Sequence, residues 1–254
     1  MKRICVLFVV GLLTACASSG GGSEGTPPMD SSRAQATAKV RTELAAAYYE
    51  RTQYAIALQE LAVALQADSD YAPAYTVRAL IRMALHEDEQ ADADFRRSLY
   101  LDDTSSDARN NYGWFLCQRG REKESLKQFQ LALKNPLYTT PEMAYANLGV
   151  CSKKAGLLKE AESNLLRALA LRPGMQEALY GLAELSYDNG DFAGAKSYFL
   201  RFSQSERELD AKQLWLAVRI ERKMRDRNSE ASYALQLRKR YPESRETQLL
   251  LQGQ

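Results

Sequence analysis

Residues 142–175 read EMAYANLGVCSKKAGLLKEAESNLLRALALRPGM, and this stretch of sequence decides the fold. Small residues stand at its eighth and twentieth positions, Gly149 and Ala161, and a larger apolar residue, Leu165, stands at its twenty-fourth. Gly156 interrupts the apolar pattern in the middle of the stretch, where a turn belongs. We therefore expect two antiparallel helices that approach each other closely where their side chains are small.

The same pattern recurs along the chain at a nearly fixed distance. The small residues of the other units are Ala45, Ala79, Gly113 and Ala183 at the eighth position, and Ala57, Ala91, Ser125 and Ala195 at the twentieth. The spacing is 34 residues, apart from one of 36 between Gly113 and Gly149. A single unit of this kind cannot bury its apolar face, so stacked neighbours must supply the core.

Five units follow this pattern, and a sixth is irregular. The regular repeats cover 38–71, 72–105, 106–141, 142–175 and 176–209. In 210–243 we predict helices over 214–223 and 229–240, with the small residue displaced to Ala231. Terminal repeats often look atypical because one face meets water, so we interpret this unit as a degenerate repeat that caps the array.

The repeat resembles the tetratricopeptide repeat over essentially the whole body of the chain. This resemblance implies an all-α fold, a right-handed superhelical solenoid of about six helix pairs, whose first helices line a concave groove. The second, fifth, ninth, twelfth and thirteenth positions of each repeat face that groove in tetratricopeptide proteins. In this chain the predicted groove residues are Thr42, Ala46, Tyr49, Thr76, Leu80, Met83, Asn110, Trp114, Val150, Lys153, Lys154, Tyr180, Glu184 and Tyr187.

Such a groove predicts a site for an extended or helical segment of another protein. Trp114 and the tyrosine and methionine side chains are candidate anchors, because aromatic residues carry much of the binding energy of interfaces. The alternative for Trp114 and Val150 is that each simply packs on a neighbouring helix.

The composition favours a binding or scaffolding protein over an enzyme. The 34 Lys and Arg residues almost balance the 32 Asp and Glu residues, and no long basic run is present, which argues against nucleic acid as a partner. The single histidine, His86, rules against His-based triads and multi-His metal sites, and its acidic turn is typical of a solvated corner. With no P-loop or dinucleotide-binding glycine motif, we expect no catalytic residue, cofactor or metal.

The first 33 residues predict a targeting signal followed by a tether. Lys2 and Arg3 precede an apolar run over 4–13, which is shorter than the roughly 20 residues of a membrane span and is typical of a secretory signal. Residues 13–16, LTAC, resemble a bacterial lipobox, so we expect a signal peptide over 1–15 and a diacylglycerol on Cys16. The alternative is an ordinary cleavage site with a chance cysteine.

Residues 16–33 then form a lipidated, flexible tether with a reach of ~20–25 Å, and the solenoid occupies 34–254. More than one acyl chain on Cys16 would hold the protein stably on a membrane. The next residue is Ala17, whereas in proteins that resemble enterobacterial lipoproteins an aspartate there favours the inner membrane. We therefore expect a lipid-anchored, periplasm-facing protein of the outer membrane.

The four cysteines have different expected fates. Cys5 leaves with the signal peptide and Cys16 carries the lipid, which leaves Cys117 and Cys151 in an oxidising compartment. These two fall on first helices of neighbouring repeats, so we predict a disulfide between them. The alternative is two buried free thiols, and a spacing of 34 residues does not resemble a zinc site.

Residues 110–117 read NNYGWFLC, and Cys151 follows the stretch Asn147-Leu148-Gly149. Together with the lipobox and the tether, these features are similar to the type IV pilus biogenesis lipoproteins, the PilF/PilW pilotin family. The resemblance implies an outer-membrane lipoprotein that binds the secretin subunit and promotes its localisation and multimerisation, on which twitching motility depends. Other pilus proteins are further candidate partners. The alternative function is a lipoprotein adaptor that brings periplasmic peptidases or cell-wall enzymes together.

Overall fold

The computed structural model describes residues 31–205 and 208–253, and within these ranges the chain is entirely helical, with no strand. The helices are α1 (Ser31–Glu50), α2 (Tyr54–Ala67), α3 (Ala72–Ala84), α4 (Asp88–Leu101), α5 (Ser106–Gln118), α6 (Glu122–Ala132), α7 (Pro141–Lys154), α8 (Leu158–Leu171), α9 (Gln176–Asp188), α10 (Phe192–Ser203), α11 (Ala211–Met224), α12 (Arg227–Arg240) and α13 (Arg245–Leu251). None of these helices is both long enough and apolar enough to cross a membrane.

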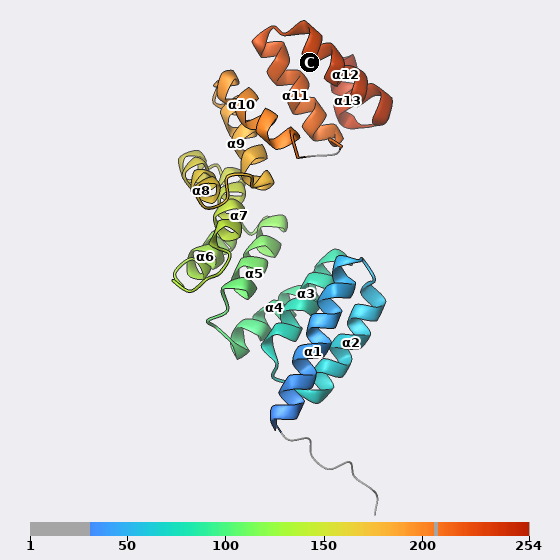
Figure 1. Ribbon diagram of the computed structural model, residues 1–254, viewed down its shortest axis with the longest axis vertical. Helices are drawn as coiled ribbons and strands as arrows, with labels where there is room; N and C mark the ends of the chain where they lie inside the picture. The colour runs from blue at the N-terminus through green and yellow to red at the C-terminus, as the bar shows by residue number, and fades with distance from the viewer. Residues whose placement is uncertain (1–30, 206–207, 254) are drawn as a thin grey trace, which may run out of the picture.

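The helices form six antiparallel pairs, from α1/α2 to α11/α12, and α13 follows the last pair. The pairs succeed one another along the long axis of the molecule in chain order, and the stack is curved (Figure 1). This arrangement confirms the predicted all-α solenoid of six helix pairs.

The close approach within each pair is built as the repeat pattern predicts. Ala57, Ala91, Ala161 and Ala195 have no exposed surface in the structure. At Gly149 a Cβ atom would lie only 2.6 Å from Leu165 Cγ and 3.1 Å from the backbone oxygen of Ala161. Only glycine therefore lets α7 and α8 approach this closely.

The N-terminal boundary differs from the expected one. Helix α1 begins at Ser31, inside the segment 16–33 that the sequence predicts to be a flexible tether. Residues 31–37 contain no helix breaker, and Ala38, Thr42 and Ala45 bury one side of the helix, so tertiary packing supports a longer helix than the repeat pattern indicates. The predicted signal peptide, Cys16 and most of the tether lie outside the described residues.

The sixth repeat has a different register from the predicted one. Leu182, Ala183 and Leu185 of α9 are buried, and the matching buried residues of α11 are 35 residues further on, at 217, 218 and 220. One extra residue in the connection between α10 and α11 therefore shifts the whole repeat. Val218 takes the place of the small eighth residue.

The predicted small residue on the last long helix is also wrong. Ala231 is exposed, whereas Ala234 and Leu237 face the core. In the shifted register the twentieth position holds Glu230, whose carboxylate accepts a hydrogen bond from Arg222 at 2.7 Å. An ion pair replaces the alanine contact of the other repeats.

The solenoid ends in a short helix that the repeat pattern does not predict. The hydroxyl of Ser244 caps α13 by accepting a hydrogen bond from the backbone N–H of Thr247, which is itself buried. Leu249 and Leu250 pack against the cluster of buried residues that contains Ala234 and Leu237. Helix α13 thus covers apolar surface that a seventh repeat would otherwise cover.

We expect the substitution Gly149→Ala to destabilise the protein. Alanine favours the helix over glycine by up to about 1 kcal/mol, but the clash with Leu165 and the Ala161 backbone opposes this by about 1–3 kcal/mol. A lower urea midpoint by circular dichroism is the expected result. The control is Gly174→Ala, since a Cβ there meets nothing within 4 Å. An equal shift in both variants would contradict the proposed role of Gly149.

Candidate protein-binding site

The first helices of the pairs form one continuous surface, which we call the first-helix face: the side of α1, α3, α5, α7, α9 and α11 that carries the predicted groove residues. Each of α1, α3, α5 and α7 contacts the next first helix in the series. Helix α11 is joined to α9 through Arg219, whose guanidinium lies 4.6 Å from the ring centroid of Tyr187.

Two hollows on this face flank Trp114. The first lies between α1, α3 and α5 and is lined mainly by apolar side chains, among them Tyr49, Leu80 and Met83. The second lies between α5, α7 and α9 and is lined by both polar and apolar side chains, among them Asn110, Asn147 and Met143. Trp114 lines both hollows, so its ring is available to a partner from either side.

Trp114 also packs inward, so both interpretations offered by the sequence apply to it. It contacts the cluster of buried residues formed by Cys117, Phe129, Leu148 and Cys151. The ammonium group of Lys154 lies 6.0 Å from the centre of its ring, which is within the range of a cation–π contact. The indole is thus held from behind and remains partly exposed on the face.

The predicted groove residues do not all reach the surface. Those that are partly or fully exposed are Ala46, Tyr49, Thr76, Leu80, Met83, Trp114, Val150, Lys153, Lys154, Tyr180, Glu184 and Tyr187. Thr42 is 5% exposed and Asn110 is 7% exposed, so neither is freely exposed, although Asn110 still lines the second hollow. The amide of Asn147 donates a hydrogen bond to Asn110 Oδ1 at 3.0 Å, which makes Asn110 part of the contact between α5 and α7.

Lys153 and Glu184 are partners of each other. The Lys153 ammonium lies 3.2 Å from a carboxylate oxygen of Glu184 and 3.1 Å from one of Asp188. These contacts join α7 to α9 and neutralise the lysine within the chain. Val150 packs against the large C-terminal cluster of buried residues, in agreement with the packing alternative for that residue.

Tyr180 and Tyr187 have aromatic surroundings. The ring of Tyr180 lies 5.2 Å from that of Phe202, and Tyr187 lies 5.4 Å from Phe192. Burial raises the pKa of Tyr180, and the nearby carboxylates of Glu184 and Asp210 raise it further. The phenol therefore stays neutral, and its surroundings are already rich in negative charge.

The sequence reasoning missed two groove positions on α11, of which Arg219 is partly exposed and Trp215 is buried. In the shifted register Trp215 and Arg219 correspond to Tyr180 and Glu184, which are groove positions. The sequence signal for both positions is the match between the apolar residues of α11 and those of α9 at a spacing of 35 residues instead of 34. The guanidinium of Arg219 lies near the rings of both Tyr187 and Trp215, at 4.6 and 5.9 Å from their centroids.

The remaining candidate sites of the sequence are unremarkable in the structure. His86 is exposed, adopts a left-handed backbone conformation with φ of 61°, and lines the edge of the first hollow. In the described parts of the chain no three His, Cys, Asp or Glu side chains are grouped so that they could hold a metal ion.

The structure joins Cys117 to Cys151 by a disulfide. The two sulfur atoms lie 2.02 Å apart and the two Cα atoms 5.9 Å apart. The bond connects α5 to α7 directly behind Trp114, and both cysteines are buried. It therefore fixes the two helices between which the second hollow opens.

We expect alkylation of the unfolded, unreduced protein to leave Cys117 and Cys151 unmodified in the mass spectrum. Closing a loop over a sequence separation of 34 residues stabilises a protein by about 2–4 kcal/mol, so the double variant Cys117→Ala/Cys151→Ala should unfold at lower urea concentration. A reductant should destabilise the wild type and leave this variant unchanged. Two alkylated thiols in the wild type would show that the bridge does not form.

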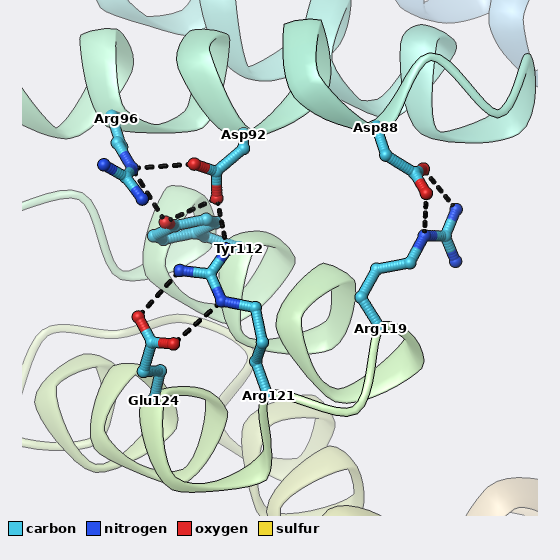
Figure 2. A network of polar contacts seen from close by, with 7 residues as sticks. All are labelled: Asp88, Asp92, Arg96, Tyr112, Arg119, Arg121 and Glu124. Carbon is cyan, nitrogen blue, oxygen red and sulfur yellow. Dashed lines mark hydrogen bonds and ion pairs between the residues drawn. The ribbon is translucent and has the colours of Figure 1, made fainter.

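The second and third repeats meet through aromatic rings and an ion-pair network. The rings of Phe95 and Tyr112 lie 5.3 Å apart, and those of Phe95 and Phe115 lie 5.6 Å apart. Around this stack, carboxylates of α4 face the arginines of the α5–α6 turn (Figure 2). Arg119 pairs with Asp88 at 2.7 Å, and Arg121 pairs with Asp92 at 2.7 Å.

The network is anchored on Tyr112 and Arg121. The Tyr112 hydroxyl donates a hydrogen bond to Asp92 at 2.9 Å, and Arg121 also forms a forked contact with Glu124 (Figure 2). Hydrogen bonds from Arg119 lower the pKa of Asp88, and hydrogen bonds from Arg121 lower that of Glu124. These contacts hold α4, the partner of α3 in its pair, against α5 and the turn that follows it.

We expect this network to make stability pH-dependent in the acid range. Because the folded-state pKa values of Asp88 and Glu124 are lowered, their stabilisation is present above the unfolded value of about 4 and is lost as the pH falls through the folded values. Between about pH 6 and pH 3, the urea midpoint of Arg119→Met should fall less than that of the wild type.

The matched control is Arg167→Met, because Arg167 has no carboxylate partner in the described part of the chain and contacts only the ring of Tyr145. Its acid profile should run parallel to that of the wild type. If the urea midpoint of Arg119→Met also falls in parallel with that of the wild type, the Arg119–Asp88 pair is not a source of the pH dependence.

The fold and the first-helix face define a tetratricopeptide-repeat protein. No family model matches the chain. The chain is 34% identical to PilW, described as a widely conserved type IV pilus biogenesis factor, over 84% of this chain and 98% of that structure, with a TM-score of 0.77. A PilF structure from Pseudomonas aeruginosa is 27% identical over 87% of this chain and 99% of its own, with a TM-score of 0.80.

Sequence comparison agrees with the structures. The type IV pilus assembly protein PilF of Pseudomonas aeruginosa is 27% identical over 97% of this chain and 96% of its own length. An uncharacterised protein of Haemophilus influenzae is 27% identical over 61% of this chain and 82% of its own length. The chain belongs to the PilF/PilW family of type IV pilus biogenesis proteins.

Proposed function

We propose that this protein is a pilotin: an outer-membrane lipoprotein that binds the secretin subunit of the type IV pilus and promotes its localisation and multimerisation. The observation that carries this proposal is the likeness to two pilus biogenesis proteins over nearly the whole chain. The sequence LTAC at residues 13–16 supports the lipid anchor, since it ends in the cysteine that a lipobox requires.

The two parts of the chain divide the task. The lipid on Cys16 gives the complex its destination, and the tether keeps the solenoid close to the membrane surface. The first-helix face holds a segment of the secretin, which raises the local concentration of subunits at the membrane before they assemble. Trp114 is the proposed central anchor, because it is fixed from behind by the Cys117–Cys151 cluster and lines two hollows.

The first test is an immunoblot of detergent-resistant secretin multimers in fractionated membranes. Deleting the gene should remove the multimer or move it to the inner membrane, and the wild-type gene should restore it. Cys16→Ser should bind purified secretin normally but misplace the multimer, because it loses only the lipid. Trp114→Ala should keep the anchor but reduce the multimer.

Tyr100→Ala is the matched control for Trp114→Ala. Tyr100 is an aromatic residue on α4 with 79% of its surface exposed, and it lies outside the first-helix face. An unchanged multimer in the deletion strain would contradict the pilotin proposal. Recovery of periplasmic hydrolases without secretin in a pull-down would then favour the adaptor function.

A further inference from the structure

Arg219 differs from the other arginines that join neighbouring helices. Its Nε atom is buried and has no hydrogen-bond partner, and in the described part of the chain it forms no ion pair. Its neighbour on α11, Arg222, by contrast, pairs with Glu230 at 2.7 Å. Lys196 pairs with Glu221, also of α11, at 2.6 Å. Neighbouring cations are therefore neutralised by carboxylates of the chain, whereas the guanidinium of Arg219 has no carboxylate partner in the described part of the chain.

The guanidinium is nonetheless held in place. It lies 4.6 Å from the ring centroid of Tyr187 and 5.9 Å from that of Trp215. Stacking on aromatic rings engages the flat face of a guanidinium and leaves the N–H groups in its plane available. Although Nε is buried, the residue as a whole is partly exposed, so a partner from outside the chain can reach the guanidinium and supply the charge pairing that it lacks.

The position of Arg219 connects it to the candidate site. In the shifted register it stands where Glu184 stands on α9 and Val150 on α7, both of them predicted groove positions. It lies at the C-terminal end of the first-helix face, beyond the Lys153–Glu184 pair. A protein segment that lies along the face from Trp114 toward α11 would meet this guanidinium.

The surroundings favour a singly charged ligand group. Arg219 is close enough to Tyr180 for its charge to influence that phenol, and the carboxylates of Glu184 and Asp210 act on the same phenol. These two negative charges repel a doubly charged phosphate more strongly than a singly charged carboxylate. An arginine fork fits a carboxylate through two parallel hydrogen bonds.

We propose that Arg219 receives the side-chain carboxylate of an aspartate or glutamate in the protein segment that binds along the first-helix face. This inference rests on the proposed function, because it takes the secretin subunit as the source of that segment. It adds a specific requirement, namely that the bound segment is acidic at its α11 end.

The experiment measures binding of the purified secretin subunit to the full solenoid by fluorescence anisotropy, at low and at high salt. Arg219→Met keeps the length and the apolar stem of the side chain but removes the charge, and we expect about tenfold or greater loss of affinity. The salt dependence should become weaker at the same time. The urea midpoint should fall only slightly, since the variant loses the contacts with the Tyr187 and Trp215 rings but no ion pair in the described part of the chain.

Lys223→Met is the matched control. Lys223 is exposed on the same helix, carries the same charge and contacts the ring of Phe192 at 5.8 Å. Its loss should change the affinity for secretin little. Equal effects of Arg219→Met and Lys223→Met would show a general charge effect and would overturn the assignment.

A charge swap identifies the ligand group. Arg219→Glu should abolish binding, and replacing one acidic residue of the secretin by lysine should restore it. If no lysine substitution at an internal acidic residue of the secretin restores binding to Arg219→Glu, the ligand of Arg219 is not a side-chain carboxylate. If the wild type does not bind secretin, the proposed function fails and this inference with it, whereas full binding by Arg219→Met overturns the inference alone.

Discussion

Where Gly149 faces Leu165, the two helices of a pair lie so close that a Cβ atom would sit 2.6 Å from the leucine side chain. Gly113 has the same relation to Phe129 one repeat earlier, at 2.8 Å. A pair packed this closely still exposes apolar side chains on its outer surfaces. It buries them only by stacking on the neighbouring pairs. Stacking in turn brings the first helices side by side, and the binding surface is a consequence of that alignment.

The contacts between repeats then decide how firmly each part of the face is fixed. Around Trp114 a disulfide joins α5 to α7, while aromatic rings and the arginine–aspartate pairs join α4 to α5. These links are far stronger than isolated surface ion pairs, because buried rings and a covalent bond accompany the charges. The centre of the face is therefore preorganised, which reduces the entropic cost of binding a segment there.

The regular repeats could be predicted from sequence because small residues mark their closest contacts. In the sixth repeat Val218 and Glu230 occupy those positions, so nothing local fixes the register, and the prediction of Ala231 failed. Helix α13 has only 7 residues and exists through its packing on α11 and α12, which no periodicity reveals. The groove residues were predicted by repeat position, and Thr42 and Asn110 are nevertheless buried because each first helix also packs against its neighbours; of these two, Asn110 still lines the second hollow.

The distribution of charge along the face follows from the same geometry. Lys153 is matched by carboxylates one repeat further on, which stabilises the stack and removes a charge that a partner could use. Lys154 and Arg219 instead rest on aromatic rings and, among the described residues, have no carboxylate partner. An aromatic ring holds a cation in place without neutralising it. The face thus presents two fixed positive charges, on α7 and α11, and the carboxylates of α9 that hold Lys153 lie on the helix between them. This separation of the two charges is the basis for proposing an extended acidic segment as the ligand.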